Sequence, residues 1–232
     1  MYKELYKEGK TAADAVERLK NIISVLRSDE GCPWDKAQTY ESIKACLIEE
    51  AYEVTEAVDN EDWDNLEEEL GDVLLQVVFY ADMGGTEGKF DLRSIANREC
   101  DKMLHRHPHV FSNNKTESID TALEKWENMK KAEAPMTIAE SMVKIPKHLP
   151  ALRKSIKIQK KAADVGFDWE DVKPAFQKIR EEADELTDAC QGGNFERIRD
   201  ELGDLLFAVT NVARFLKVDP EDALNFTSQR FI

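Results

Sequence analysis

An acidic sequence pattern occurs twice in this chain with the same internal spacing. A Glu-Glu-x-x-Glu segment precedes a Glu-Leu-Gly-Asp segment, first at 49–53 and 69–72 and again 132 positions later at 181–185 and 201–204. Residues three or four apart share one face of a helix, so each segment can present two carboxylates side by side. We therefore expect two copies of one helical unit, each with its own carboxylate cluster.

The spacing within each copy predicts a helical hairpin. When two consecutive helices fold back on each other, the two acidic segments of the first copy face each other if the turn is centred on Glu61. The corresponding turn of the second copy is centred on Gly193, within a Gln-Gly-Gly-Asn sequence that favours a turn. Each hairpin is therefore expected to bring four carboxylates to one place.

The carboxylates that flank the apolar face are the expected metal ligands. At about 100° per residue, Glu50 lies about 60° from the apolar stripe that contains Leu47, whereas Glu49 lies about 160° from it. In a chain with 34% charged residues, one such segment alone would be a solvated helix face. Four clustered carboxylates would repel one another without a cation, so the duplicated hairpin favours a metal site. The expected ligands are Glu50, Glu53, Glu69 and Asp72 in the first copy and Glu182, Glu185, Glu201 and Asp204 in the second.

The ligand type indicates which cation and which substrate to expect. A cluster made of carboxylates, without histidine or thiolate, suits Mg²⁺, for which Mn²⁺ can substitute. Mg²⁺ bound in this way usually accompanies phosphate groups. The sequence therefore favours a phosphate-containing substrate.

The chain is expected to be all-α, because period-2 alternation is nearly absent and long segments have helical periodicity. The expected helices are 12–27, 40–58, 63–83, 92–105, 151–163, 174–190, 195–216 and one that begins near 220, with a further helical stretch at 121–133. We interpret the chain as tandem antiparallel helical bundles. The expected domains are 1–115 and 151–232, joined by a connector at 116–150.

Composition limits the partners and the location. A net charge of −15 and a pI near 4.8 oppose direct binding to nucleic acid or to an anionic membrane, whereas a Mg²⁺-bound polyphosphate brings its own positive charge. The four cysteines have no Cys-x-x-Cys spacing, so we expect free thiols in a reducing compartment. No signal peptide or membrane-length apolar run is evident, and we expect a soluble cytoplasmic protein.

Several further segments, together with the acidic pairs, resemble the MazG family of nucleoside triphosphate pyrophosphohydrolases. They are 31–35 (GCPWD), 106–111 (RHPHVF), 145–152 (IPKHLPAL) and 165–169 (VGFDW). The resemblance covers nearly the whole chain from about residue 15. It implies an all-α bundle that forms a homodimer, binds Mg²⁺ through the acidic motif and cleaves nucleoside triphosphates to monophosphate and pyrophosphate.

This resemblance also implies roles for residues outside the ligand set. Glu49 or Glu181, beside the ligands, is the candidate to accept a proton from the attacking water. The family's phosphate-binding basic residues correspond to Lys102 and Arg106 in the first half and to Arg230 in the second. The second-half counterpart of Arg106 falls beyond Ile232, so we expect the first half to carry more of the turnover unless a partner chain contributes.

Two questions stay open at the level of sequence. Trp34 and Trp169 follow turns at similar places in the two halves, and each is either a core anchor, which we favour, or a platform for a nucleobase. The competing function is a non-enzymatic, metal-stabilised helical dimer that binds nucleotide or a protein partner. A di-iron bundle is disfavoured because neither acidic motif contains histidine.

Overall fold

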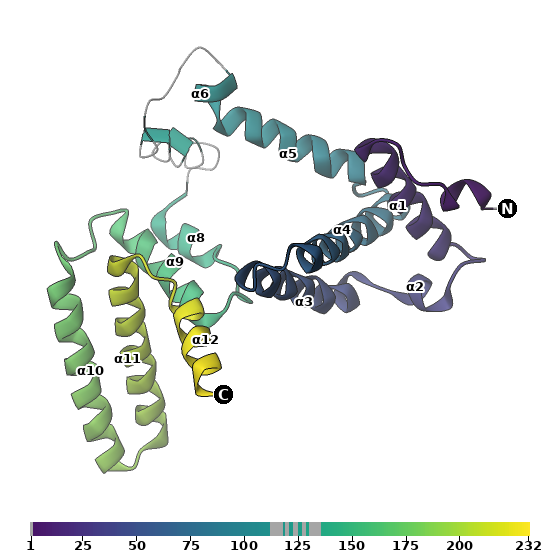
Figure 1. Cartoon of the computed structure of the whole chain (residues 1–232). Helices are drawn as coiled ribbons and strands as arrows, with labels where there is room; N and C mark the ends of the chain where they lie inside the picture. Colours follow the sequence, from purple (N-terminus) through teal and green to yellow (C-terminus); the bar gives the residue numbers. More distant parts are fainter. Residues whose placement is uncertain (1, 112–117, 119–120, 123–124, 127–128, 130–135) are drawn as a thin grey trace. The chain divides into compact units, whose positions relative to one another are not determined.

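The structure is a computed structural model that divides into two units, Met1–Met129 and Lys130–Ile232 (Figure 1). It describes residues 2–111, 118, 121–122, 125–126, 129 and 136–232. Regular elements within these described residues are all helical, which confirms the all-α prediction. The expected helical stretch at 121–133 lies mostly outside the described residues. The division between the units falls inside the expected connector, and the expected domain limits stay a prediction.

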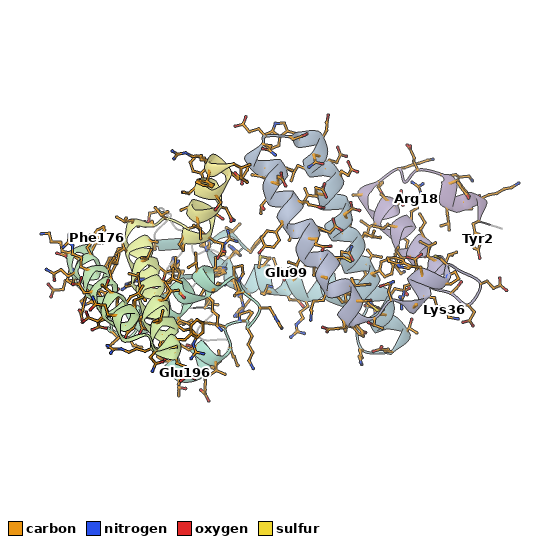
Figure 2. All side chains as sticks on the ribbon, turned by 90° about the horizontal axis from the view of Figure 1, so that it is seen from below. Tyr2, Arg18, Lys36, Glu99, Phe176 and Glu196 are labelled. Carbon is orange, nitrogen blue, oxygen red and sulfur yellow. The ribbon has the colours of Figure 1, made fainter. Side chains whose placement is uncertain are left out.

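A helical hairpin forms the centre of the first unit. The helices of this unit are η1 (Lys3–Tyr6), α1 (Ala12–Leu26), α2 (Pro33–Ala37), α3 (Tyr40–Asp59), α4 (Trp63–Thr86), α5 (Leu92–Arg106) and α6 (Pro108–Phe111). α3 pairs with α4, and both α1 and α5 pack against α4 (Figure 1). The buried core consists of Ile23, Ile43, Val78, Phe79 and Met83. Arg18 on α1 lies beside η1, where its Nε donates to the Leu5 carbonyl at 2.7 Å (Figure 2).

Local hydrogen bonds and one left-handed residue set the register of the first hairpin. α3 begins with a capping box, in which Thr39 Oγ1 accepts from the Ser42 amide at 3.2 Å and Ser42 Oγ accepts from the Thr39 amide at 2.9 Å. Asp62 caps the start of α4, where its Oδ1 accepts from the Asn65 amide at 3.1 Å. Between the helices, Glu61 has a φ of 53°, so the chain reverses at the predicted turn centre.

The second unit repeats this hairpin. Its helices are α8 (Ile138–Val143), α9 (Ala151–Ala163), α10 (Val172–Gly192), α11 (Phe195–Leu216) and α12 (Pro220–Phe231). α10 pairs with α11, α9 packs against α11, and α8 and α12 pack against α9. Gly193 caps α10 in the left-handed region with a φ of 68°, and Asn194 Oδ1 accepts from the Glu196 amide at 3.0 Å. The predicted second turn is confirmed, and the repeated hairpin is consistent with tandem duplication.

Equivalent positions on α4 and α11 carry ion pairs of opposite polarity. Asp82 on α4 accepts from Arg27 Nε at 3.0 Å, and both side chains are largely buried. Arg214, 132 positions after Asp82, donates to the two carboxylate oxygens of Asp168 at 2.5 and 2.9 Å. The acid therefore lies on the hairpin in the first unit, whereas the base lies on the hairpin in the second.

All four cysteines are free thiols, as expected. Within the described part of the chain, no helix combines the length and the apolar character needed to span a membrane.

The two adjacent glycines at the second turn give a matched test of the register. We expect Gly193→Ala to destabilise the protein by about 1 kcal/mol, because its left-handed φ of 68° disfavours any side chain. Gly192→Ala is the control, since Gly192 lies inside α10 and a Cβ there meets nothing within 4 Å. We expect the control to be neutral or slightly stabilising. The midpoints of urea unfolding measure both, and equal midpoints for the two variants would contradict the assigned role of Gly193.

Candidate functional site

The first hairpin brings three of its expected ligands together. Glu50 comes from α3, and Glu69 and Asp72 come from α4. Each contributes one carboxylate oxygen to a group whose atoms all lie within 4.8 Å of one another. All three side chains are half-buried. Glu53, the fourth expected ligand, is exposed and is not a member of this group, but its carboxylate interacts with both Glu50 and Glu69.

Burial and mutual repulsion both act on the carboxyl groups of this cluster. Burial raises the pKa of Glu50, and the negative charges of Asp72 and Glu53 raise this pKa further. Burial also raises the pKa of Glu69, with Glu53 as the next contributor. Ionised carboxylates are therefore held together at a cost that a cation would relieve.

The second hairpin forms the equivalent cluster, in which Glu182 is buried, Glu201 is half-buried and Asp204 is exposed. Glu182, Glu201 and Asp204 contribute oxygens that lie within 4.8 Å of one another, and Glu182 is only 5% exposed. Burial raises the pKa of Glu185, and so do the charges of Glu182 and Glu201. In Glu182, atom Oε2 is buried without a hydrogen-bond partner. A buried carboxylate oxygen without a partner is an open ligand position.

Lys178 distinguishes the second cluster from the first. Its Nζ lies 2.6 Å from Glu182 Oε1 and 2.9 Å from Glu181 Oε1. These two residues follow Lys178 on α10 by four and three positions, so all three share one face of the helix. Hydrogen bonds to Glu182 and Glu181 raise the pKa of Lys178 far above its ordinary value. The position 132 residues earlier is occupied by Cys46 rather than by a basic residue. One carboxylate of the second cluster is thus already partly neutralised by a fixed ammonium group.

The donor chemistry of both clusters fits a hard divalent cation. Every candidate ligand atom is a carboxylate oxygen, as Mg²⁺ and Mn²⁺ prefer. The raised pKa values and the open Glu182 Oε2 are further features that a bound cation would account for. The candidate proton acceptors lie at the edge, where Glu49 is exposed and Glu181 is exposed and paired with Lys178.

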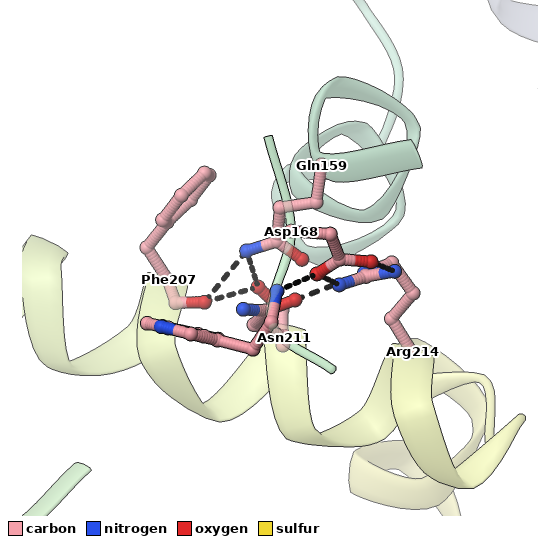
Figure 3. Close-up of polar contacts among 7 residues, drawn as sticks. Gln159, Asp168, Phe207, Asn211 and Arg214 are labelled. Atoms are coloured by element: carbon pink, nitrogen blue, oxygen red, sulfur yellow. Dashed lines mark hydrogen bonds and ion pairs between the residues drawn. The ribbon is translucent and has the colours of Figure 1, made fainter. Parts of the chain in front are cut away.

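A pocket of about 680 Å³ opens beside the second cluster. Its lining includes Glu182, Asp204 and Lys178, together with an apolar wall that contains Trp169 and Phe207. The bend that carries Trp169 is fixed by the ion pair between Asp168 and Arg214 (Figure 3). Hydrogen bonds from Arg214 lower the pKa of Asp168, so this carboxylate stays ionised. The carboxylates therefore border a cavity that is large enough for a small organic ligand.

The other predicted binding residues are not all gathered at the clusters. Lys102 on α5 forms an ion pair with Glu99, and the Arg106 guanidinium lies 5.6 Å from the centre of the Trp126 ring. On α12, the Arg230 guanidinium lies 5.8 Å from the centre of the Phe226 ring. Among the described residues, no hydrogen bond or ion pair joins Lys102 or Arg230 to a carboxylate of either cluster.

The expectation that both tryptophans are core anchors is wrong for Trp34. Its side chain is 66% exposed, because it lies on the short helix α2 at the outside of the first unit. Trp169 is 39% exposed and lines the pocket, so it is not a core residue either. The half-exposed position of Trp169 is the one that fits the alternative of a ligand platform.

Sequence reasoning missed Lys178 and the pair formed by Asp168 and Arg214. Lys178 could have been found, because a basic residue three and four positions before two acidic ones predicts contacts along one helix face. Arg214 carried no such signal. Its partner Asp168 is 46 positions away in sequence, and only the packing of α9 against α11 brings the two together.

The chain is similar in sequence to known nucleotide pyrophosphohydrolases. A family model described as the MazG nucleotide pyrophosphohydrolase domain matches residues 38–111 and 170–232, the two stretches that contain the carboxylate clusters. The nucleoside triphosphate pyrophosphohydrolase of Escherichia coli K12 is 43% identical over 220 residues, covering 93% of this chain and 84% of that protein.

Proteins of Thermotoga maritima are similar as well. The nucleoside triphosphate pyrophosphohydrolase/pyrophosphatase MazG of that organism is 42% identical over 223 residues, covering 96% of this chain and 85% of the relative. The crystal structure of a mazG-related protein from T. maritima aligns with a TM-score of 0.43 at 36% identity, covering 50% of this chain and 98% of that one.

The raised pKa of Glu50 predicts how stability depends on pH when metal is removed. Its folded pKa lies above the ordinary value of 4.5, so the penalty in the folded state grows as pH rises above 4.5 and is complete above the folded pKa. With chelator at pH 7, Glu50→Gln should therefore melt at a higher temperature than the wild type. The difference should disappear below pH 4.5, where the carboxyl is protonated in both states.

Glu56→Gln, an exposed change on the same helix, is the control for this comparison and should show no such pH-dependent difference. Adding Mg²⁺ at pH 7 should raise the melting temperature of the wild type more than that of Glu50→Gln. A Glu50→Gln variant that is less stable than the wild type in chelator at pH 7 would show that the cluster is not strained.

Proposed function

This chain belongs to the MazG nucleotide pyrophosphohydrolase family, and from that membership we infer that it hydrolyses nucleoside triphosphates to nucleoside monophosphate and pyrophosphate. One observation supports placing this reaction at the second cluster. The buried Glu182 carboxylate borders the pocket of about 680 Å³, and its Oε2 has no hydrogen-bond partner. A triphosphate can place its phosphates at the carboxylates and its nucleoside in the apolar part of this pocket.

The residues of each cluster would hold the cation that this reaction requires. We propose Glu182, Glu185, Glu201 and Asp204 as ligands in the second unit, and Glu50, Glu53, Glu69 and Asp72 in the first. Bound Mg²⁺ or Mn²⁺ would neutralise charge on the pyrophosphate leaving group and make water more acidic. Glu181 in the second unit, or Glu49 in the first, would accept the proton of the attacking water. The fixed ammonium of Lys178 adds positive charge beside the phosphates.

We propose the second unit as the main site of turnover. There a cavity of about 680 Å³ borders the carboxylates. This proposal departs from the expectation drawn from the basic residues, which favoured the first half because of Lys102 and Arg106. Lys102 is paired with Glu99, whereas Lys178 places a cationic group at Glu182 in the second cluster.

A homodimer is proposed on the basis of the exposed apolar side chains of the second hairpin. Phe176 lies on the outside of α10 and is 42% exposed (Figure 2). Other large apolar residues of this hairpin that remain exposed are Phe195, Leu202, Leu206, Val209 and Leu216. A second copy would remove such surface from water. The four free thiols support the further proposal of a cytoplasmic location.

Product analysis tests the reaction type. With Mg²⁺ or Mn²⁺ and a panel of ribo- and deoxyribonucleoside triphosphates, we expect equal amounts of monophosphate and pyrophosphate, measured by chromatography and a pyrophosphate assay. Excess chelator should abolish turnover. Accumulation of diphosphate and orthophosphate would contradict the bond assignment. Absence of turnover with every triphosphate would favour the non-enzymatic alternative.

A matched pair of variants tests which unit is active. Glu182→Gln removes the buried charge of the second cluster, and we expect it to lower kcat/KM by about 100-fold or more. Glu50→Gln makes the equivalent change in the first cluster, and we expect an effect below about threefold. Circular dichroism controls for folding. The opposite ranking would place turnover in the first unit and restore the expectation drawn from its basic residues.

A further inference from the structure

The pocket of the second unit contains a buried hydrogen-bond acceptor without a partner. Gln159 on α9 is 6% exposed and lines this pocket. Its Nε2 donates to the Phe207 carbonyl at 2.8 Å and to Thr210 Oγ1 at 3.3 Å (Figure 3). A backbone carbonyl can only accept, so the amide orientation is fixed and Oε1 points elsewhere. This Oε1 is buried and forms no hydrogen bond. Buried polar atoms in native proteins nearly always have a hydrogen-bond partner, so this exception indicates a position for a ligand.

The same pocket contains an amide whose donor is oriented by an ion pair. Asn211 is the residue after Thr210 on α11, and its Oδ1 accepts from Arg214 Nε at 2.9 Å. Arginine has no acceptor, so this contact requires the oxygen of Asn211 to face Arg214. Asp168 in turn holds Arg214 (Figure 3). The Asn211 Nδ2 group is therefore left as a donor, and it makes no hydrogen bond to any described residue.

Aromatic side chains complete the pocket around these two polar residues. Trp169 and Phe207 both line it, and each is about two-fifths exposed, at 39% and 42%. Planar heterocycles stack well on such rings. A pocket with aromatic walls, one oriented acceptor and one oriented donor matches a flat ligand that has a donor next to an acceptor along its edge.

The equivalent place in the first unit is filled by the protein itself. The counterpart of Asn211 on α4 is Phe79, which belongs to the buried core and is 5% exposed. The Arg27 guanidinium covers this ring at 5.6 Å from its centre and pairs with Asp82, the counterpart of Arg214. An aromatic ring of the chain thus occupies the position at which the second unit offers a hydrogen-bond donor.

We propose that Gln159 and Asn211 recognise the base of the substrate. Gln159 Oε1 accepts from an N–H of the base, and Asn211 Nδ2 donates to the neighbouring ring nitrogen or carbonyl oxygen. The ligand class is a nucleobase with an intact N–H donor beside an acceptor, and bases alkylated at that nitrogen are rejected. This assignment rests on the proposed hydrolysis of nucleoside triphosphates and names how the site selects among them.

The test compares the best natural triphosphate with its analogue that lacks the base N–H. The pairs are ATP with purine riboside triphosphate, UTP with N3-methyl-UTP, GTP with N1-methyl-GTP and CTP with N4,N4-dimethyl-CTP. For the wild type we expect kcat/KM to fall about tenfold or more with the analogue, because the buried acceptor loses its donor. For Gln159→Leu the two substrates should differ by less than about twofold.

Two further variants make this test specific. Gln191→Leu makes the same substitution at an exposed position at the end of α10, and it should keep the full wild-type discrimination. Asn211→Asp retains an oxygen for Arg214 but replaces the donor by an acceptor, so we expect it to change the order of preference among the four natural bases. Asn211→Asp also carries the test if Gln159→Leu does not fold, as judged by circular dichroism.

The outcomes separate this inference from the proposed function. Equal kcat/KM values for substrate and analogue in the wild type, full discrimination by Gln159→Leu, or an unchanged base order in Asn211→Asp would overturn the inference. If no triphosphate is hydrolysed, the proposed function fails. Base recognition is then tested by calorimetric binding of the corresponding nucleoside monophosphates. Equal affinity for the bases with and without the N–H overturns the inference, whereas a tenfold difference in affinity supports it.

Discussion

The register of the two hairpins determines where every charged residue of the site lies. In each hairpin, one residue in the left-handed region reverses the chain, Glu61 in the first unit and Gly193 in the second. The side chains that cap the following helices, Asp62 and Asn194, then start the second helix at a fixed position. A shift of one residue would rotate a helix by about 100° and separate the carboxylates that now lie within 4.8 Å. Turn geometry, rather than attraction between the ligands, therefore assembles the clusters.

Because the carboxylates repel one another, other interactions of the protein must hold them in place. The first unit does so with a core that includes Ile43 on α3 and Val78 on α4. The buried apolar residues of the second hairpin are mainly small, namely Ala175, Ala189, Ala208 and Val212. That unit compensates with charge, since Lys178 neutralises part of the repulsion at Glu182. The two copies thus support the same cluster by different means, and the small buried residue Ala208 of the second hairpin lines the pocket.

The helices and the hairpin turns were predictable because they depend on local signals. The predicted segment 195–216 coincides with α11, and 40–58 differs from α3 by one residue. Periodicity and capping residues carry that information within a few neighbours. The short helices α2, α6 and α8 were missed, since none has two full turns of apolar pattern. Glu50 and Glu182 were placed at their clusters because their register follows from the turn. Gln159 and Asn211 could not be identified, because their amide orientations depend on contacts between α9 and α11 that no sequence pattern records.

The opposite polarity of the two buried ion pairs also bears on how a duplicated chain avoids mispairing while it folds. Two similar hairpins in one chain could dock on each other's partners. If α4 packed in the place of α11, Asp82 would meet Asp168, and if α11 packed in the place of α4, Arg214 would meet Arg27. Either exchange would replace a salt bridge by two like charges in a largely buried place, which is strongly unfavourable. Because one ion pair is reversed, α4 and α11 can each form a salt bridge only with the partner residue of their own unit.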